Sequence, residues 1–281
     1  MMNALERRST FALSSIFALR MLGLFMIIPV FSVAGQSYEY ATPALIGLAV
    51  GIYGLTQAIL QIPFSLIADR YSRKPLVVLG LLLFALGGAI AAMSDTIYGV
   101  IIGRAIAGGG AVSAVVMALL ADVTREENRM KAMAVMGMSI GLSFVVAFTM
   151  GPWVTGLVGI SGLFWVTTVM GLAAIAMLLM VPKVTRHHKN FQQGYLEQLK
   201  QVLKMGDLNR LHISVFTLHL LLTAMFIYVP SQLIEVAELP LSSHGWIYLP
   251  LLVVSLFFAF PSIILAEKYR KMRSIFLTAI G

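Results

Sequence analysis

Long apolar runs separated by short polar segments dominate the amino-acid sequence. Eight of these runs have about 20 residues or more, the length that an α-helix needs to cross the hydrocarbon core of a bilayer. The eight runs lie at 9–33, 45–67, 75–94, 97–120, 132–152, 162–181, 211–232 and 245–266. A ninth run begins near Ser274 and reaches only Gly281, so we expect the chain to be part of a longer protein. The pattern predicts an all-α polytopic membrane protein.

The composition supports this prediction. Hydrophobic residues make up 59% of the chain and charged residues 11%, whereas ordinary soluble domains have about 45–50% and about 25%. Too little polar surface is left to cover a water-soluble fold. The chain has no cysteine, which excludes a disulfide scaffold, a thiolate metal site and a cysteine nucleophile.

Basic residues fall almost entirely on one side of the predicted bundle. With the N-terminus in the cytoplasm, all but two of the 20 Lys and Arg residues lie at the N-terminus or in loops on that same side. The two exceptions, Arg20 and Arg104, lie inside predicted spans. Because basic residues flanking membrane spans stay in the cytoplasm, we expect a multi-pass protein with a cytoplasmic N-terminus. The placement of the basic residues then orients the helices. The net charge of +8 is explained without a nucleic-acid partner.

Loop lengths divide the chain into three parts. Residues 1–181 hold six predicted spans with short loops, 182–210 form a longer, basic cytoplasmic loop, and 211–281 begin a second bundle. A short basic loop with an acidic residue recurs after the second span, at Asp69, and after the eighth, at Glu267. Duplicated helical halves are typical of transporters that work by alternating access. Chance similarity between short basic loops is the alternative.

Three motifs carry a resemblance to a known family. They read Ser65-x-x-x-Asp69-Arg70-x-Ser72-Arg73-Lys74, Arg104-x-x-x-Gly108-Gly109-Gly110 and Gly151-Pro152-x-x-Thr155-Gly156. Together they resemble the major facilitator superfamily, in particular its drug:proton antiporter branch, although serines replace two glycines of the first motif and Thr155 replaces one of the third. The resemblance implies a major-facilitator-type bundle of twelve spans in the bacterial inner membrane, of which this chain holds the N-terminal six and the start of the second half.

The first motif is the most specific of the three. By resemblance, Asp69, Arg70, Arg73 and Lys74 form a gating loop that contacts the second half in one state of the transport cycle. A carboxylate at a helix end can also hold nearby arginines and helix termini. The alternative is a basic loop that only sets the topology.

The third motif lies near the end of the fifth span. Proline removes a backbone hydrogen bond, and small residues let helices approach closely. By resemblance, Gly151, Pro152 and Gly156 form an antiporter-type bend. A generic kink with small-residue packing is the alternative.

Two arginines lie inside predicted membrane spans, where a charged side chain is energetically unfavourable. A central arginine costs about 2.5–3.5 kcal/mol on insertion scales, and spans one to six have no acidic residue at mid-depth. We therefore expect Arg104 and Arg20 to face a cavity or take part in coupling. Anchoring of the bundle is the alternative for Arg20.

Four further polar residues lie inside spans. Tyr53, Gln57 and Gln61 are spaced to share one face of the second span, which predicts a substrate wall or, alternatively, hydrogen bonds between helices. His219, inside the seventh span, has a reference pKa near 6.5, which makes it a candidate for proton coupling. A packing histidine is the alternative.

The sequence favours a secondary active transporter over an enzyme. It has no phosphate-binding glycine loop, no metal-ligand spacing and no nucleophile–base pair, so we expect no cofactor and no metal. The prediction is a monomer in the lipid bilayer that exports a small amphipathic or drug-like solute against proton entry. The alternatives are proton-coupled uptake and, for this chain alone, a non-transporting helical bundle.

Overall fold

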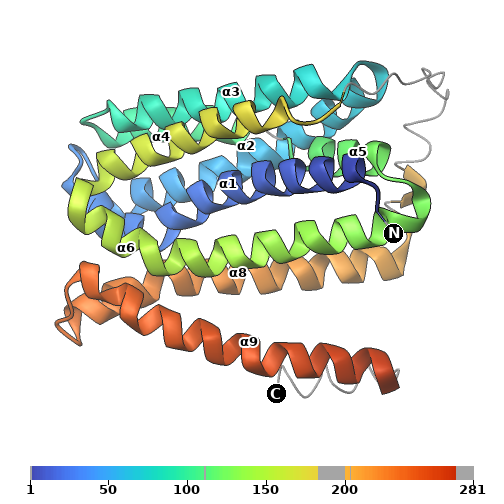
Figure 1. Ribbon diagram of the computed structural model, residues 1–281. Helices are drawn as coiled ribbons and strands as arrows, with labels where there is room; N and C mark the ends of the chain where they lie inside the picture. Colours follow the sequence, from blue (N-terminus) through green and yellow to red (C-terminus); the bar gives the residue numbers. More distant parts are fainter. Residues whose placement is uncertain (1, 111, 183–199, 203, 270–281) are drawn as a thin grey trace.

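The computed structural model describes residues 2–110, 112–182, 200–202 and 204–269. Long helices lying side by side make up this part of the chain (Figure 1). The helices are α1 (Ala4–Ala34), α2 (Pro43–Arg70), α3 (Arg73–Ala92), α4 (Ile97–Gly109), α5 (Ser113–Val123), α6 (Glu126–Leu178), α8 (Gly206–Glu235) and α9 (His244–Tyr269), with short 3-10 turns η1 (Gly35–Ser37) and η2 (Leu241–Ser243). The predicted all-α fold is confirmed.

Six helical segments of the described chain, with α4 and α5 counted as one, are long and apolar enough to cross a membrane. The predicted fourth span, 97–120, is interrupted: α4 ends at Gly109, and Gly110 leaves the helical conformation with ψ of 46°. The predicted fifth and sixth spans lie in one helical element, α6, which has 53 residues. The predicted ninth span and most of the predicted central loop lie outside the described residues.

Gly159 separates the two halves of α6. Its φ of 70° and ψ of −179° are non-helical, and glycine adopts such positive φ values without the steric penalty of a Cβ atom. At about 1.5 Å per residue, a straight helix of this length would far exceed the hydrocarbon core of a bilayer. The break therefore lets one element supply two crossings.

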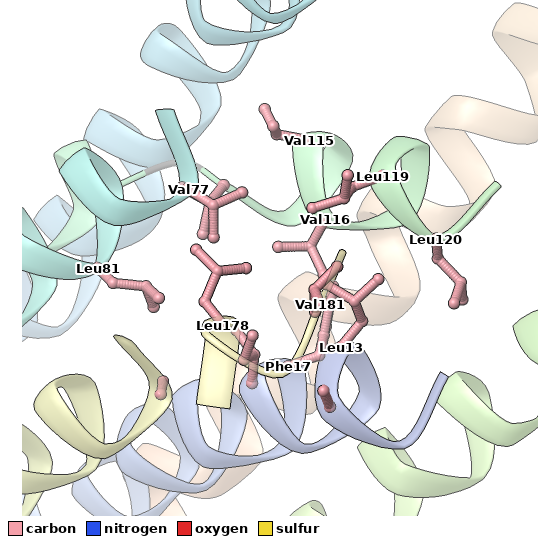
Figure 2. Close-up of a cluster of buried hydrophobic side chains, with 14 of the residues drawn as sticks. Leu13, Phe17, Val77, Leu81, Val115, Val116, Leu119, Leu120, Leu178 and Val181 are labelled. Atoms are coloured by element: carbon pink, nitrogen blue, oxygen red, sulfur yellow. The ribbon is translucent and has the colours of Figure 1, made fainter. Parts of the chain in front are cut away.

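Two separate apolar clusters fill the bundle between its ends. One packs α1, α3, α5 and the end of α6 together near the N-terminus of the chain, as Figure 2 shows for Leu13, Val77, Val116 and Leu178. The other lies toward the opposite end and includes Phe31 and Phe164. The small cluster of Tyr53, Phe84 and Ala107 is distinct from both.

Glycines bring helix backbones together in the bundle. A Cβ atom at Gly103 of α4 would lie 2.6 Å from the carbonyl oxygen of Gly87 in α3. At Gly108, a Cβ atom would overlap the carbonyl oxygen of Tyr53 in α2. Small residues at such positions are what allows membrane helices to approach closely, so α4 is fixed between α2 and α3.

Adding a methyl group at Gly103 is expected to destabilise the bundle. Overpacking typically costs about 1–3 kcal/mol, and each kcal/mol lowers the melting temperature by about 2–4 °C in a protein of this size class. Gly137→Ala is the matched control, because a Cβ atom there meets nothing within 4 Å. Thermal unfolding of purified Gly103→Ala and Gly137→Ala proteins checks the prediction, and equal melting temperatures would contradict it.

Candidate functional site

Arg20 lies near the middle of α1 and is only 2% exposed. Its Nη1 atom donates to the Ser113 hydroxyl at 2.6 Å, and its Nη2 atom donates to the Tyr53 hydroxyl and to Gln57 Oε1, each at 3.0 Å. These contacts join α1 to the middle of α2 and to the first residue of α5. Every one of the named acceptors is neutral.

Arg104 of α4 is buried on the other side of Tyr53. Its Nε donates to the carbonyl of Ala49, and its Nη2 donates to the carbonyl of Val50 at 3.3 Å. The centre of its guanidinium lies 5.5 Å from the centre of the Tyr53 ring, a distance at which a cation is attracted to an aromatic face. Tyr53 therefore contacts both buried arginines, one through its hydroxyl and one through its ring.

The structure brings together Arg20, Tyr53, Gln57 and Arg104, and this group is called the polar centre below. The sequence named each of the four as a candidate cavity residue without predicting their mutual contacts. Ser113 is an additional member, which no sequence motif predicted. Its signal was weak, since serine follows the glycine-rich stretch of the fourth span without a recognised spacing. It begins α5 because the chain leaves the helical conformation at Gly110.

The other two predicted cavity residues lie apart from this cluster. Gln61 is half-buried on α2, and its carbonyl accepts a hydrogen bond from the Ser65 hydroxyl at 2.8 Å. His219 is exposed on α8, with Nδ1 2.9 Å from the carbonyl oxygen of Val215 in the same helix. Neither residue has a described contact with Arg20 or Arg104.

A cavity of about 10 Å³ adjoins Tyr53 and Arg104, and Phe84 and Thr167 are among its other lining residues. Such a volume is close to the minimum for one water molecule. The interior around Arg104 is therefore closed to a larger solute. Gln57 and Ser113, by contrast, are partly exposed beside Arg20.

The predicted gating loop contains a buried arginine between two carboxylates. Arg73 Nη2 lies 3.0 Å from Asp69 Oδ1, and Arg73 Nη1 lies 2.9 Å from Asp122 Oδ2. Lys74 donates to the carbonyl of Val181, and Arg70 lies over the ring of its neighbour Tyr71 at 5.9 Å. Asp122, at the end of α5, was not identified from the sequence as the partner of Arg73.

A second charged cluster lies at the same end of the bundle, where α1 begins. Glu6 is 2% exposed and accepts hydrogen bonds from Arg125 N at 2.9 Å, Arg125 Nε at 3.1 Å and Asn128 Nδ2 at 3.1 Å. It also forms a capping box with Asn3 at the start of α1. The hydrogen bonds to Glu6 raise the pKa of Arg125. No sequence motif predicted this cluster.

The predicted bend lies where α6 meets two other elements. A Cβ atom at Gly151 would lie 2.7 Å from the carbonyl oxygen of Met26 in α1, and one at Gly156 would lie 3.2 Å from Ser242 Cβ in η2. Pro152 is internal to α6 and buried. The three predicted residues thus share one region, and both glycines lie at positions of close helix approach.

Aromatic rings continue this contact toward α8 and α9. The ring of Phe148 in α6 lies 4.1 Å from that of Phe226 in α8 and 6.2 Å from that of Tyr248 in α9. Tyr248 lies 6.0 Å from the ring of His244, which is fully buried. No short motif marked these residues, because their partners come from distant parts of the chain.

Ionisable side chains are rare inside membrane helices, and those present usually serve ion or solute passage. A bundle of spanning helices with two arginines at its centre therefore has the character of a multi-span membrane transporter. The sequence model of the Major Facilitator Superfamily matches residues 13–281 of the chain. The chain therefore belongs to this family.

The chain is 44% identical over 278 residues to the inner membrane transport protein YajR of Escherichia coli; the match covers 98% of this chain and 61% of YajR. A tetracycline resistance protein, class H, of Pasteurella multocida is 30% identical over 141 residues, covering 49% of this chain and 34% of that protein. An inward-facing bacterial homologue of the human lysosomal transporter Spinster shares the fold, with a TM-score of 0.75 and 16% identity over 96% of this chain and 64% of its own. The chain spans less than two thirds of the length of YajR.

The Arg73–Asp122 pair is expected to stabilise the bundle more than the Arg73–Asp69 pair. Asp122 is 15% exposed and Asp69 is 68% exposed, and solvent weakens exposed ion pairs to about 0.2–1 kcal/mol. Double-mutant cycles with Arg73→Met, Asp122→Asn and Asp69→Asn, followed by thermal unfolding, measure both couplings. A coupling to Asp69 equal to or larger than that to Asp122 would contradict the described geometry.

Proposed function

We propose that the full-length protein is a secondary active transporter that exports a small amphipathic solute across the bacterial inner membrane while protons enter. The observation that carries this proposal is the buried contact of Tyr53 with Arg20 and Arg104. A structural bundle gains little from two buried charges, since each is costly in a membrane. A transporter can use them to bind or release a solute and to respond to protons.

The charged loop supports alternating access. Buried Arg73 holds Asp69 at the surface of the bundle, where the carboxylate can meet the second half in one conformation and leave it in another. In this proposal the loop faces the cytoplasm, in agreement with the distribution of basic residues in the sequence. Lys74 ties the loop to the end of α6.

Two observations favour export over uptake. The Gly151–Pro152 element resembles that of antiporters and lies at close contacts of α6 with α1 and η2. The tetracycline resistance protein that matches half of the chain bears a name associated with drug resistance. His219 is the candidate for proton coupling, because histidine is the side chain most often used to shuttle protons and this one lies inside a predicted span.

Arg104→Ala is expected to abolish transport by the full-length protein without changing its level in the membrane. The variant loses one central charge and both hydrogen bonds to α2 carbonyls. Accumulation of neutral, anionic and cationic amphipathic dyes in energised membrane vesicles measures transport, and immunoblotting measures the membrane level. Arg210→Ala is the control, because Arg210 is exposed. Undiminished transport by the Arg104 variant would overturn the role of this residue.

Export makes a directional prediction. In inverted vesicles that respiration has acidified inside, the full-length protein should concentrate a transported dye in the lumen as protons leave. An ionophore that exchanges potassium for protons should stop accumulation by removing the pH gradient. Accumulation in energised right-side-out vesicles would instead show uptake and would contradict the proposal.

A further inference from the structure

The spans of this chain carry positive charge without negative charge. All 12 acidic residues lie outside the eight predicted spans, whereas Arg20 and Arg104 lie inside them. The hydrogen-bond partners of these two arginines are hydroxyl, amide and carbonyl oxygens. Neutral dipoles hold a guanidinium in place, but they do not cancel its charge.

The start of α5 adds to the positive potential beside Arg20. The N-terminus of a helix carries roughly half a positive charge from its unpaired N–H groups, and α5 has 11 residues. Arg20 Nη1 donates to the hydroxyl of Ser113, the first residue of α5. The guanidinium of Arg20 therefore lies beside the N-terminus of α5.

Arg20 also has unused hydrogen-bonding capacity. Its Nε atom is buried and, in the described structure, has no hydrogen-bond partner. Buried polar atoms of proteins are nearly always hydrogen-bonded, and a guanidinium N–H group forms a strong hydrogen bond with an anionic oxygen of a carboxylate, sulfonate or phosphate. The partly exposed Gln57 and Ser113 mark the side from which such a group would approach.

From this arrangement we infer that the transported solute is an amphipathic anion whose acidic group binds Arg20 beside the start of α5. The inference rests on the proposed transport function and names its substrate class. A cationic drug would meet two like charges with no acidic partner in the spans of this chain. The anion would meet Arg20 directly, with Tyr53 holding Arg104 near it.

Two dyes that differ by one sulfonate test the inference. The full-length protein in nanodiscs of zwitterionic lipid is titrated with 1-anilinonaphthalene-8-sulfonate and with the neutral N-phenyl-1-naphthylamine, and fluorescence from empty nanodiscs is subtracted. We expect the sulfonated dye to bind at least tenfold more tightly. Decyl sulfonate should displace it at lower concentration than decyltrimethylammonium does.

Charge at residue 20 should control this preference. Arg20→Gln should weaken binding of the sulfonated dye at least tenfold and of the neutral dye less than twofold, and Arg20→Lys should recover most of the loss. Arg210→Gln, on the exposed start of α8, is the matched control. Equal weakening of both dyes would show a structural role and overturn the inference.

The comparison of dyes and competitors on the unmodified protein decides the question even where Arg20→Gln does not fold. Tighter binding of the neutral dye, or equal displacement by the cationic detergent, would overturn the anionic substrate class. Anion-selective binding without flux in vesicles would contradict the proposed transport function but support the anion-binding site at Arg20. Flux of cationic dyes without anion-selective binding would support the proposed transport function and overturn the anionic substrate class.

Discussion

The centre of the bundle depends on keeping two guanidinium groups surrounded by protein dipoles where water is scarce. Arg104 reaches the carbonyls of Ala49 and Val50 only because α4 lies against α2, and Gly108 permits that approach by having no side chain. Tyr53 then presents its ring to Arg104 and its hydroxyl to Arg20. The two arginines therefore depend together on the close spacing of α2 and α4, on the break after α4 and on the polar side chains of α2.

The two ends of the bundle are held by different forces. Near the N-terminus of the chain, Glu6–Arg125 and Asp69–Arg73–Asp122 link helix ends through charged groups. At the opposite end, close backbone contacts and aromatic rings join α6 to α1, α8 and α9. Ion pairs weaken in salt and respond to pH, whereas apolar contacts do so far less. Changes in salt concentration or pH should therefore loosen the end of the bundle near the N-terminus more than the opposite end.

Much of the helical pattern could be predicted because an apolar run of fixed length is a direct signature of a spanning helix. Arg20 and Arg104 were recognisable because arginine is costly inside such a run. The break at Gly110 was missed, since its neighbours remain apolar and hydropathy does not register backbone conformation. Ser113, Asp122 and Arg125 were missed as partners because their contacts depend on how the helices rotate and pack.

The turn at Gly159 exposes two apolar side chains, Leu157 and Val158, which are 66% and 53% accessible. Such a tip gains by resting among the lipid headgroups and upper acyl chains. Water-borne labels and proteases should reach it poorly, although it is a corner of the chain. The same tip should respond to bilayer thickness, because a thinner membrane would push these two side chains into water.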